Sequence, residues 1–271
     1  MEPYLLTSNN KISLIELNFF FPLFLLSCIW IIFTLVYPQS DLADLSDNAY
    51  QSPVSLPDFS GYSDVKQKKI DFFSFLYPLV EAENQHIQSI RDSLETLKNK
   101  STKRLNSTEH AWLNQLATNY RVKTTEVAEQ LAELTLKVDT LPTSLVLAQA
   151  AIESGWGTSR FAKQGNNLFG QWCFKKGCGI VPQHRANDQT HEVASFSSIN
   201  ESIKAYMSNL NSFPAYQKLR DLRAAERTKR TKVSGASLVG GLERYSEQGK
   251  TYTDKVFKMM RQNKLEQYSK I

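Results

Sequence analysis

The sequence predicts a mainly α-helical protein with a small β lobe, an α+β fold, preceded by one transmembrane helix. Three observations lead to this prediction. Apolar residues recur in steps of three and four over most of the chain after residue 64, which is typical of amphipathic helices. Between residues 170 and 197 this period is lost, and glycines with short apolar runs predict short strands or a hairpin. Residues 19–36, near the amino terminus, are almost wholly apolar.

The apolar segment Phe19–Val36 has the length of a membrane span. Eighteen helical residues cover about 27 Å, close to the roughly 30 Å of a bilayer core. The residues before it contain one Lys and two Glu, and no small-residue cleavage site follows it. We therefore expect an uncleaved anchor at residues 17–37 rather than a secretory signal. Since Lys11 precedes the span and three aspartates follow it, residues 1–16 should be cytoplasmic and the remaining chain outside.

Residues 38–64 are rich in Ser, Asp and Pro and have no helical period, which predicts a flexible linker. The chain carries a net charge of +5. This mild excess would favour binding to an anionic polymer or surface, but it is equally consistent with a solvated basic face. The sequence has no phosphate-binding G-x-x-x-x-G-K-[ST] loop, so a nucleotide-binding role is set aside, and we expect no nucleic-acid partner.

Residues 65–140 are predicted to form a helical extension. An amphipathic stripe runs over residues 65–98, where Pro78 should kink or break the helix. Asn106 and Glu109 have the spacing of a helix N-cap, so a second helix should begin there, and a third should carry residues 127–138.

Residues 141–271 are predicted to form the catalytic domain, with its β lobe at about 170–197. Pro142 opens a helix that is apolar nearly all round and that ends at Gly155, so it should be buried. Ser198 and Glu201 form a capping-box pattern at the start of another helix. Further helices are expected at about 213–226, 234–245 and 251–265.

The chain has three cysteines. Cys28 lies inside the expected span, whereas Cys173 and Cys178 flank a short glycine-containing turn and predict a small disulfide in an oxidising compartment. A zinc half-site is the alternative, but no second Cys/His pair has matching spacing. We expect no metal and no cofactor.

A single carboxylate, Glu153, lies among alanines and an isoleucine near the end of the buried helix. Apolar burial and the carboxyl end of the helix dipole both raise the pKa of such a group. A carboxylic acid that stays protonated near neutral pH is what a glycoside-cleaving general acid requires. A structural salt bridge at the helix end is the alternative interpretation.

Four ordered motifs surround this carboxylate. They are Ala148–Gly157 (AQAAIESGWG), Asn166–Gly170 (NNLFG), Phe196-Ser197-Ser198 followed by Ser202 and Tyr206, and Tyr245-x6-Tyr252-x2-Lys255-Val256. Together they resemble the bacterial peptidoglycan glucosaminidases, the mannosyl-glycoprotein endo-β-N-acetylglucosaminidase-like family (glycoside hydrolase 73). The N-L-F-G-Q-W-C-F-x-x-G-C-G stretch and the preceding helices resemble its Bax-like branch. The resemblance covers about residues 65–271.

This resemblance implies a lysozyme-like glucosaminidase domain with a sugar-binding groove between an α-helical and a β lobe. It implies a peptidoglycan hydrolase that cuts the β-1,4 bond after N-acetylglucosamine. Together with the anchor expected at residues 17–37, this predicts a protein of the inner membrane with its catalytic domain in the periplasm. Glu153 matches the family's general acid. The residues that match cleft-shaping or substrate-facing positions are Ser154, Trp156, Asn167, Phe169, Gly170, Tyr206, Tyr245 and Tyr252. Glycan strands are the expected partner, and the helical extension suits a further cell-wall protein.

The sequence does not identify the second catalytic group. Glu192 in the β lobe is preferred over Asp188, and a substrate N-acetyl group could also act as the nucleophile. Two other functions fit the same residues: a lytic transglycosylase, which needs one acid, and a catalytically weak wall-binding or scaffold module. An amidase fits poorly, because the sequence shows no zinc ligand set.

Overall fold

The computed structural model describes residues 42–45, 54–100, 104–183, 185 and 189–269. The predicted anchor at residues 17–37, with Cys28, lies outside these residues, and so does Asp188. Among the residues that are described, no helix has the length and apolar character needed to cross a bilayer. Leu42–Ile271 form one compact unit, so the expected helical extension and the expected catalytic domain share a single core.

The long helix α2 (Val65–Lys98) contributes much of this core. Its N-cap is Asp64, and its buried stripe includes Phe72, Leu76 and Leu94. The helix continues through Pro78 without a break. It packs against α4 (Val127–Lys137), α5 (Thr143–Ser154) and α7 (Ile199–Ser212). The predicted extension therefore supports the helix that carries Glu153.

Helix starts follow the predicted capping chemistry. In α3 (Ser107–Asn119), the Asn106 side chain accepts the Glu109 N–H, and the Glu109 carboxylate accepts the Asn106 N–H. At α7, Ser198 accepts the N–H of Glu201, but the Glu201 carboxylate turns to the N–H of Ser197 instead. The first capping box is confirmed, and the second is half formed.

Helix α5 is buried nearly all round, as predicted. It ends at Gly155, whose φ of 57° is the left-handed conformation that glycine adopts most easily. The short helix α6 (Arg160–Gly165) follows. The carboxyl-terminal part of the chain then wraps α5, which packs against α9, α10 and η5. These later elements are η3 (Pro214–Tyr216), α8 (Gln217–Thr228), α9 (Gly235–Leu238), η4 (Val239–Leu242), α10 (Lys250–Gln262) and η5 (Leu265–Tyr268).

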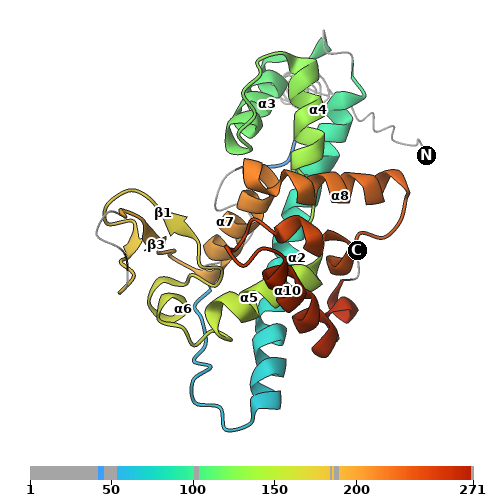
Figure 1. Cartoon of the computed structure of the whole chain (residues 1–271). Coiled ribbons are helices and arrows are strands. Elements are labelled where there is room, and N and C mark those ends of the chain that lie inside the picture. Colours follow the sequence, from blue (N-terminus) through green and yellow to red (C-terminus); the bar gives the residue numbers. More distant parts are fainter. Residues whose placement is uncertain (1–41, 46–53, 101–103, 184, 186–188, 270–271) are drawn as a thin grey trace, which may run out of the picture. The chain divides into compact units, whose positions relative to one another are not determined.

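The β lobe is a small three-stranded antiparallel sheet to one side of α6 and α7 (Figure 1). Its strands are β1 (Trp172–Cys173), β2 (Gly179–Ile180) and β3 (Glu192–Ala194), in the order β1-β3-β2. Trp172 pairs with Val193, and Cys173 pairs with Glu192. The mainly helical fold with a small sheet is thus confirmed.

The flexible linker expected at residues 38–64 is wrong for the part that the structure describes. Phe59 is 2% exposed and packs edge-on against Phe72, with ring centroids 5.3 Å apart. Upstream, the Ala43 N–H donates to Ser93 Oγ, and the Val54 N–H donates to Asn200 Oδ1. The polar composition of this segment did not predict that one aromatic residue, Phe59, is buried in the core.

A buried ion cluster joins three parts of the helical framework. Asp139, in the connection between α4 and α5, is 3% exposed. Its carboxylate accepts two hydrogen bonds from Arg227, at 2.8 and 3.2 Å, and lies 3.4 Å from Arg223 and 3.7 Å from Arg91. Burial raises the pKa of Asp139, but the arginines, Arg223 foremost, lower it more, so its net pKa lies below the ordinary value. The cluster links α2, α8 and the connection between α4 and α5.

We expect Asp139→Asn to lower the free energy of unfolding by about 3 kcal/mol, because it leaves the buried Arg223 without its counter-charge. Urea unfolding at pH 7 measures this loss. The matched control is Glu243→Gln, which breaks an exposed pair with Lys218 and should cost less than about 1 kcal/mol. Equal effects of the two substitutions would contradict the assignment of Asp139 as the structural hub.

Candidate active site

Glu153 opens onto a cleft of about 590 Å³ between the helical framework and the β lobe. Its walls come from the end of α5, the segment that leads into β1, α7, η3 and the loop before α10. The lining residues are Glu153, Phe169, Gly170, Gln171, Trp172, Asn209, Tyr216, Tyr245, Ser246, Glu247 and Gln248.

The Glu153 side chain is partly buried at the last turn of α5. Desolvation raises the pKa of its carboxyl group above the ordinary value of 4.5, although a hydrogen bond from Tyr252 and the charge of Lys255 oppose part of this rise. The carboxyl end of the helix dipole acts in the same direction as burial. The pKa shift expected from the sequence is present, and no ion pair to Glu153 is found among the described residues.

A chain of hydrogen bonds fixes how Glu153 is held. The Tyr206 hydroxyl donates to Gln149 Oε1, and Gln149 Nε2 donates to the Tyr252 hydroxyl at 2.8 Å. The Tyr252 hydroxyl is also hydrogen-bonded to the Glu153 carboxyl group. Because its oxygen accepts from Gln149, its single hydrogen can be donated to Glu153. Gln149 lies one helical turn before Glu153, so both side chains share a face of α5. Glu153 is thus held by Tyr252 and also lines the cleft.

One carboxyl oxygen of Glu153, Oε2, lies beside Gly170. A Cβ at this glycine would be 3.6 Å from Glu153 Oε2, and the φ of Gly170 is 64°. The neighbouring backbone is fixed from two sides. Tyr245 donates its hydroxyl to the Phe169 carbonyl at 2.7 Å, and Asn167 Nδ2 donates to the carbonyls of Gln171 and Ala194. The geometry suits donation of a proton to a substrate oxygen in the cleft.

The structure separates the residues predicted for the site into two layers. Four of them line the cleft: Glu153, Phe169, Gly170 and Tyr245. Behind them are four buried residues: Ser154, Asn167, Tyr206 and Tyr252. Phe169 stacks on Tyr206 with ring centroids 3.9 Å apart, and Tyr252 stacks on Tyr245 at 5.3 Å, so the inner layer supports the cleft wall.

Ser154 and Trp156 shape the turn after α5. Ser154 Oγ accepts the Gly157 N–H at 2.8 Å and donates to the Ala150 carbonyl. Trp156 has a φ of 60°, which is uncommon for a bulky residue. Its ring packs edge-on against Phe72 and Phe73 of α2, with centroid distances of 5.7 and 5.2 Å. The Trp156 side chain therefore fastens this turn to α2 and does not line the cleft.

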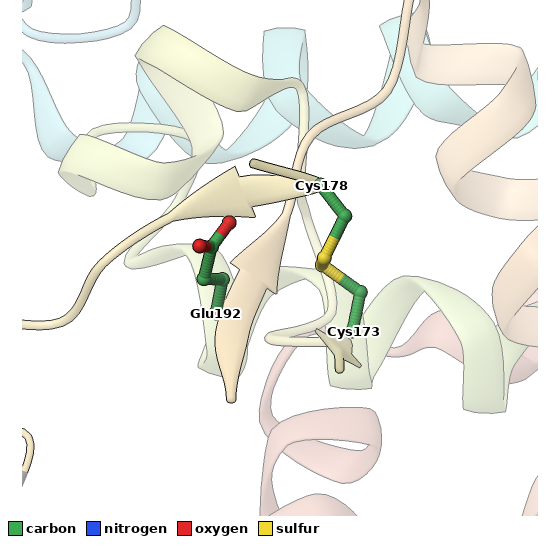
Figure 2. A group of neighbouring side chains, drawn as sticks. All are labelled: Cys173, Cys178 and Glu192. Atoms are coloured by element: carbon green, nitrogen blue, oxygen red, sulfur yellow. A yellow bond between two sulfur atoms is a disulfide. The ribbon is translucent and has the colours of Figure 1, made fainter. Parts of the chain in front are cut away.

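Glu192 lies beside the disulfide of Cys173 and Cys178 (Figure 2). Its carboxylate accepts the Gly177 N–H at 3.0 Å and the Gly179 N–H at 2.8 Å, and these bonds lower its pKa. The two sulfurs and this carboxylate are within 4.8 Å of one another, but the sulfurs are bonded to each other. Glu192 is absent from the cleft lining.

Seven lining residues were missed by the sequence reasoning: Gln171, Trp172, Asn209, Tyr216, Ser246, Glu247 and Gln248. Gln171 and Trp172 could have been suspected, because they follow the N-L-F-G motif directly. The other five come from segments far apart in the sequence, and no local pattern marks them. Glu247 is an exposed carboxylate with no hydrogen-bond or ion-pair partner in the described part of the chain.

Known proteins resemble this chain in sequence. The family model described as mannosyl-glycoprotein endo-beta-N-acetylglucosaminidase matches residues 128–265, beginning at α4. Protein bax of Escherichia coli (strain K12) is 34% identical over 226 residues, which cover 83% of this chain and 80% of that protein. The catalytic domain of the autolysin Auto from Listeria monocytogenes aligns with a TM-score of 0.37 at 20% identity, covering 64% of this chain and 93% of that domain.

The two glutamates should affect stability with opposite signs. Because the folded pKa of Glu153 is raised, its ionisation destabilises the fold as pH rises from 4.5 through that pKa, so Glu153→Gln should be more stable than the wild type at pH 8. The folded pKa of Glu192 is lowered, so its stabilisation is present above pH 4.5 and is lost as pH falls through that pKa. Glu192→Gln should therefore be less stable at pH 8.

Thermal unfolding of the wild type and both variants between pH 4 and 8 measures these differences. Both differences should shrink toward pH 4: that of Glu153 because its carboxyl group becomes protonated in both states, and that of Glu192 because the unfolded state begins to take up its proton. A Glu153→Gln variant that is less stable than the wild type at pH 8 would show that the carboxylate makes a stabilising ion pair there.

Proposed function

Because the chain belongs to the mannosyl-glycoprotein endo-beta-N-acetylglucosaminidase family and is a glycoside hydrolase, we propose that it cleaves the β-1,4 bond after N-acetylglucosamine in peptidoglycan. Glu153 is the general acid. The observation that carries this proposal is a carboxyl group with a raised pKa that is hydrogen-bonded to Tyr252 and lines an open cleft. In this proposal residues 17–37 anchor the protein in the inner membrane, and the catalytic domain works in the periplasm.

Glu153 donates its proton to the glycosidic oxygen, and the bond from that oxygen to C1 of the N-acetylglucosamine unit breaks. Positive charge then develops on the sugar ring. A water molecule adds to C1 and loses a proton to a base, which leaves a hydroxyl group at C1 and an ionised Glu153. Exchange with solvent returns both groups to their starting protonation states.

For the base, the geometry supports Glu247 better than Glu192. Glu247 lines the same cleft as Glu153, and its carboxylate has no partner among the described residues. Both oxygens of Glu192 already accept backbone N–H groups in the β lobe. A base must approach the water that attacks C1, which requires a free carboxylate oxygen facing the cleft. We assign Glu192 to holding the disulfide loop.

The reaction is tested with the full-length protein, purified in detergent and incubated with purified peptidoglycan. The products are reduced with borohydride and identified by mass. We expect new reducible N-acetylglucosamine ends from the wild type and at least about a 1,000-fold lower rate from Glu153→Gln, because the acid is lost. Anhydro-sugar ends would identify a lytic transglycosylase, and wall binding without products would identify a binding module.

The base is tested by comparing Glu247→Gln with Glu192→Gln. We expect the first to lower kcat by about 100-fold or more while substrate binding persists, and the second to retain most of the kcat of the wild type. Proton NMR of fresh product should show the inverted α-anomer, since water attacks the opposite face. A retained β-anomer together with normal kcat in Glu247→Gln would instead support participation of the substrate N-acetyl group.

A further inference from the structure

The β lobe exposes an aromatic ring inside the cleft. Trp172 is 58% exposed and lines the same cavity as Glu153. A large apolar side chain exposed in a concave site is informative, because its hydration is unfavourable unless a ligand covers it. Trp172 belongs to β1, on the wall formed by the β lobe, whereas Glu153 is at the end of α5.

The Trp172 ring is supported on one face. It stacks on His191 with ring centroids 3.9 Å apart and planes 15° from parallel. His191 is itself buried, and its carbonyl accepts a hydrogen bond from Arg185 at 2.9 Å. The imidazole covers one indole face, so the exposed area of Trp172 includes the other.

The strand that carries Trp172 is held in place by covalent and hydrogen-bonded contacts. The next residue, Cys173, forms the disulfide with Cys178 and pairs across the sheet with Glu192. The Glu192 carboxylate in turn accepts hydrogen bonds from the Gly177 and Gly179 amides of the same loop. A ring positioned in this way loses little conformational freedom on binding, which favours recognition of a rigid ligand.

We infer that Trp172 forms a sugar-binding subsite, in which its free face stacks on a pyranose ring of the glycan strand whose bond reaches Glu153. The inference rests on the proposed function and adds a residue that positions the substrate. The same cleft offers hydrogen-bonding groups for hydroxyl and N-acetyl substituents. Asn209 has a side-chain amide with no partner in the described residues, and Gln248 uses only its oxygen, toward Lys255.

Phe174 provides a matched control on the same lobe. It is 72% exposed, two residues after Trp172, and is not part of the cleft lining. If the exposed aromatic residues of the β lobe bound a membrane or a protein partner, replacing either ring should have the same effect on glycan affinity. If Trp172 forms a sugar subsite, only the replacement of Trp172 should lower that affinity.

Binding is measured with the full-length Glu153→Gln protein in detergent, titrated calorimetrically with the β-1,4-linked pentamer of N-acetylglucosamine. Adding Trp172→Ala should weaken binding by about 10-fold or more, as expected for the loss of one aromatic stacking contact. Trp172→Phe should restore part of the affinity, whereas Phe174→Ala should leave it unchanged. Equal affinity with and without Trp172, or equal losses for Trp172 and Phe174, would overturn the inference.

Kinetics with peptidoglycan separate this inference from the proposed function. In an otherwise wild-type protein, Trp172→Ala should raise KM with a smaller effect on kcat, because the ring contacts substrate away from the reacting bond. A wild type that hydrolyses peptidoglycan and a Trp172→Ala variant with unchanged KM and pentamer affinity would refute the subsite alone. A wild type without turnover whose pentamer binding depends on Trp172 would refute the hydrolase and keep the subsite.

Discussion

The burial of α5 is the constraint on which the rest of this structure depends. A helix that is apolar nearly all round must be covered on most sides, and α2, α9, α10 and η5 provide this cover. Only at its last turn does the cover open, where Glu153 meets the cleft. The same packing that stabilises the fold therefore desolvates one carboxyl group and raises its pKa. Buried aromatic rings at this end supply hydrogen bonds without introducing a counter-charge that would keep Glu153 ionised.

The predicted helical extension is part of this arrangement. Phe72 and Phe73 of α2 hold Trp156 in its left-handed conformation, and Phe59 packs beneath Gly157, where an added Cβ would lie 2.8 Å from the Phe59 ring. The turn that ends α5 thus depends on residues about 85 to 100 positions earlier in the chain. Removal of α2 would leave the turn after Glu153 without support, so we interpret the extension and the catalytic domain as one structural unit.

Local chemistry explains which features were predictable from the sequence. The stripe of α2, the cap at Asn106, the buried character of α5 and its end at Gly155 all depend on neighbouring residues, and each prediction is confirmed. The docking of Phe59 was missed, because composition describes a segment on average and one aromatic ring decided its position. In the site, motifs located the right neighbourhood but could not tell cleft-lining residues from buried ones. Asn209, Tyr216 and Glu247 reach the cleft from separate elements, which only tertiary packing brings together.

Three glutamates show how the environment divides tasks between identical side chains. Glu153 is desolvated, which favours its protonated form. Glu192 receives two backbone N–H groups, which favour its charged form but occupy its oxygens. Glu247 is exposed at the cleft, and its carboxylate has no hydrogen-bond or ion-pair partner among the described residues. An acid and a base that work together need different environments, and the partly buried Glu153 and the exposed Glu247 have them within one cleft. On this basis we propose Glu153 and Glu247 as the reacting pair, whereas Glu192 binds the Gly177 and Gly179 amides of the β lobe that carries Trp172.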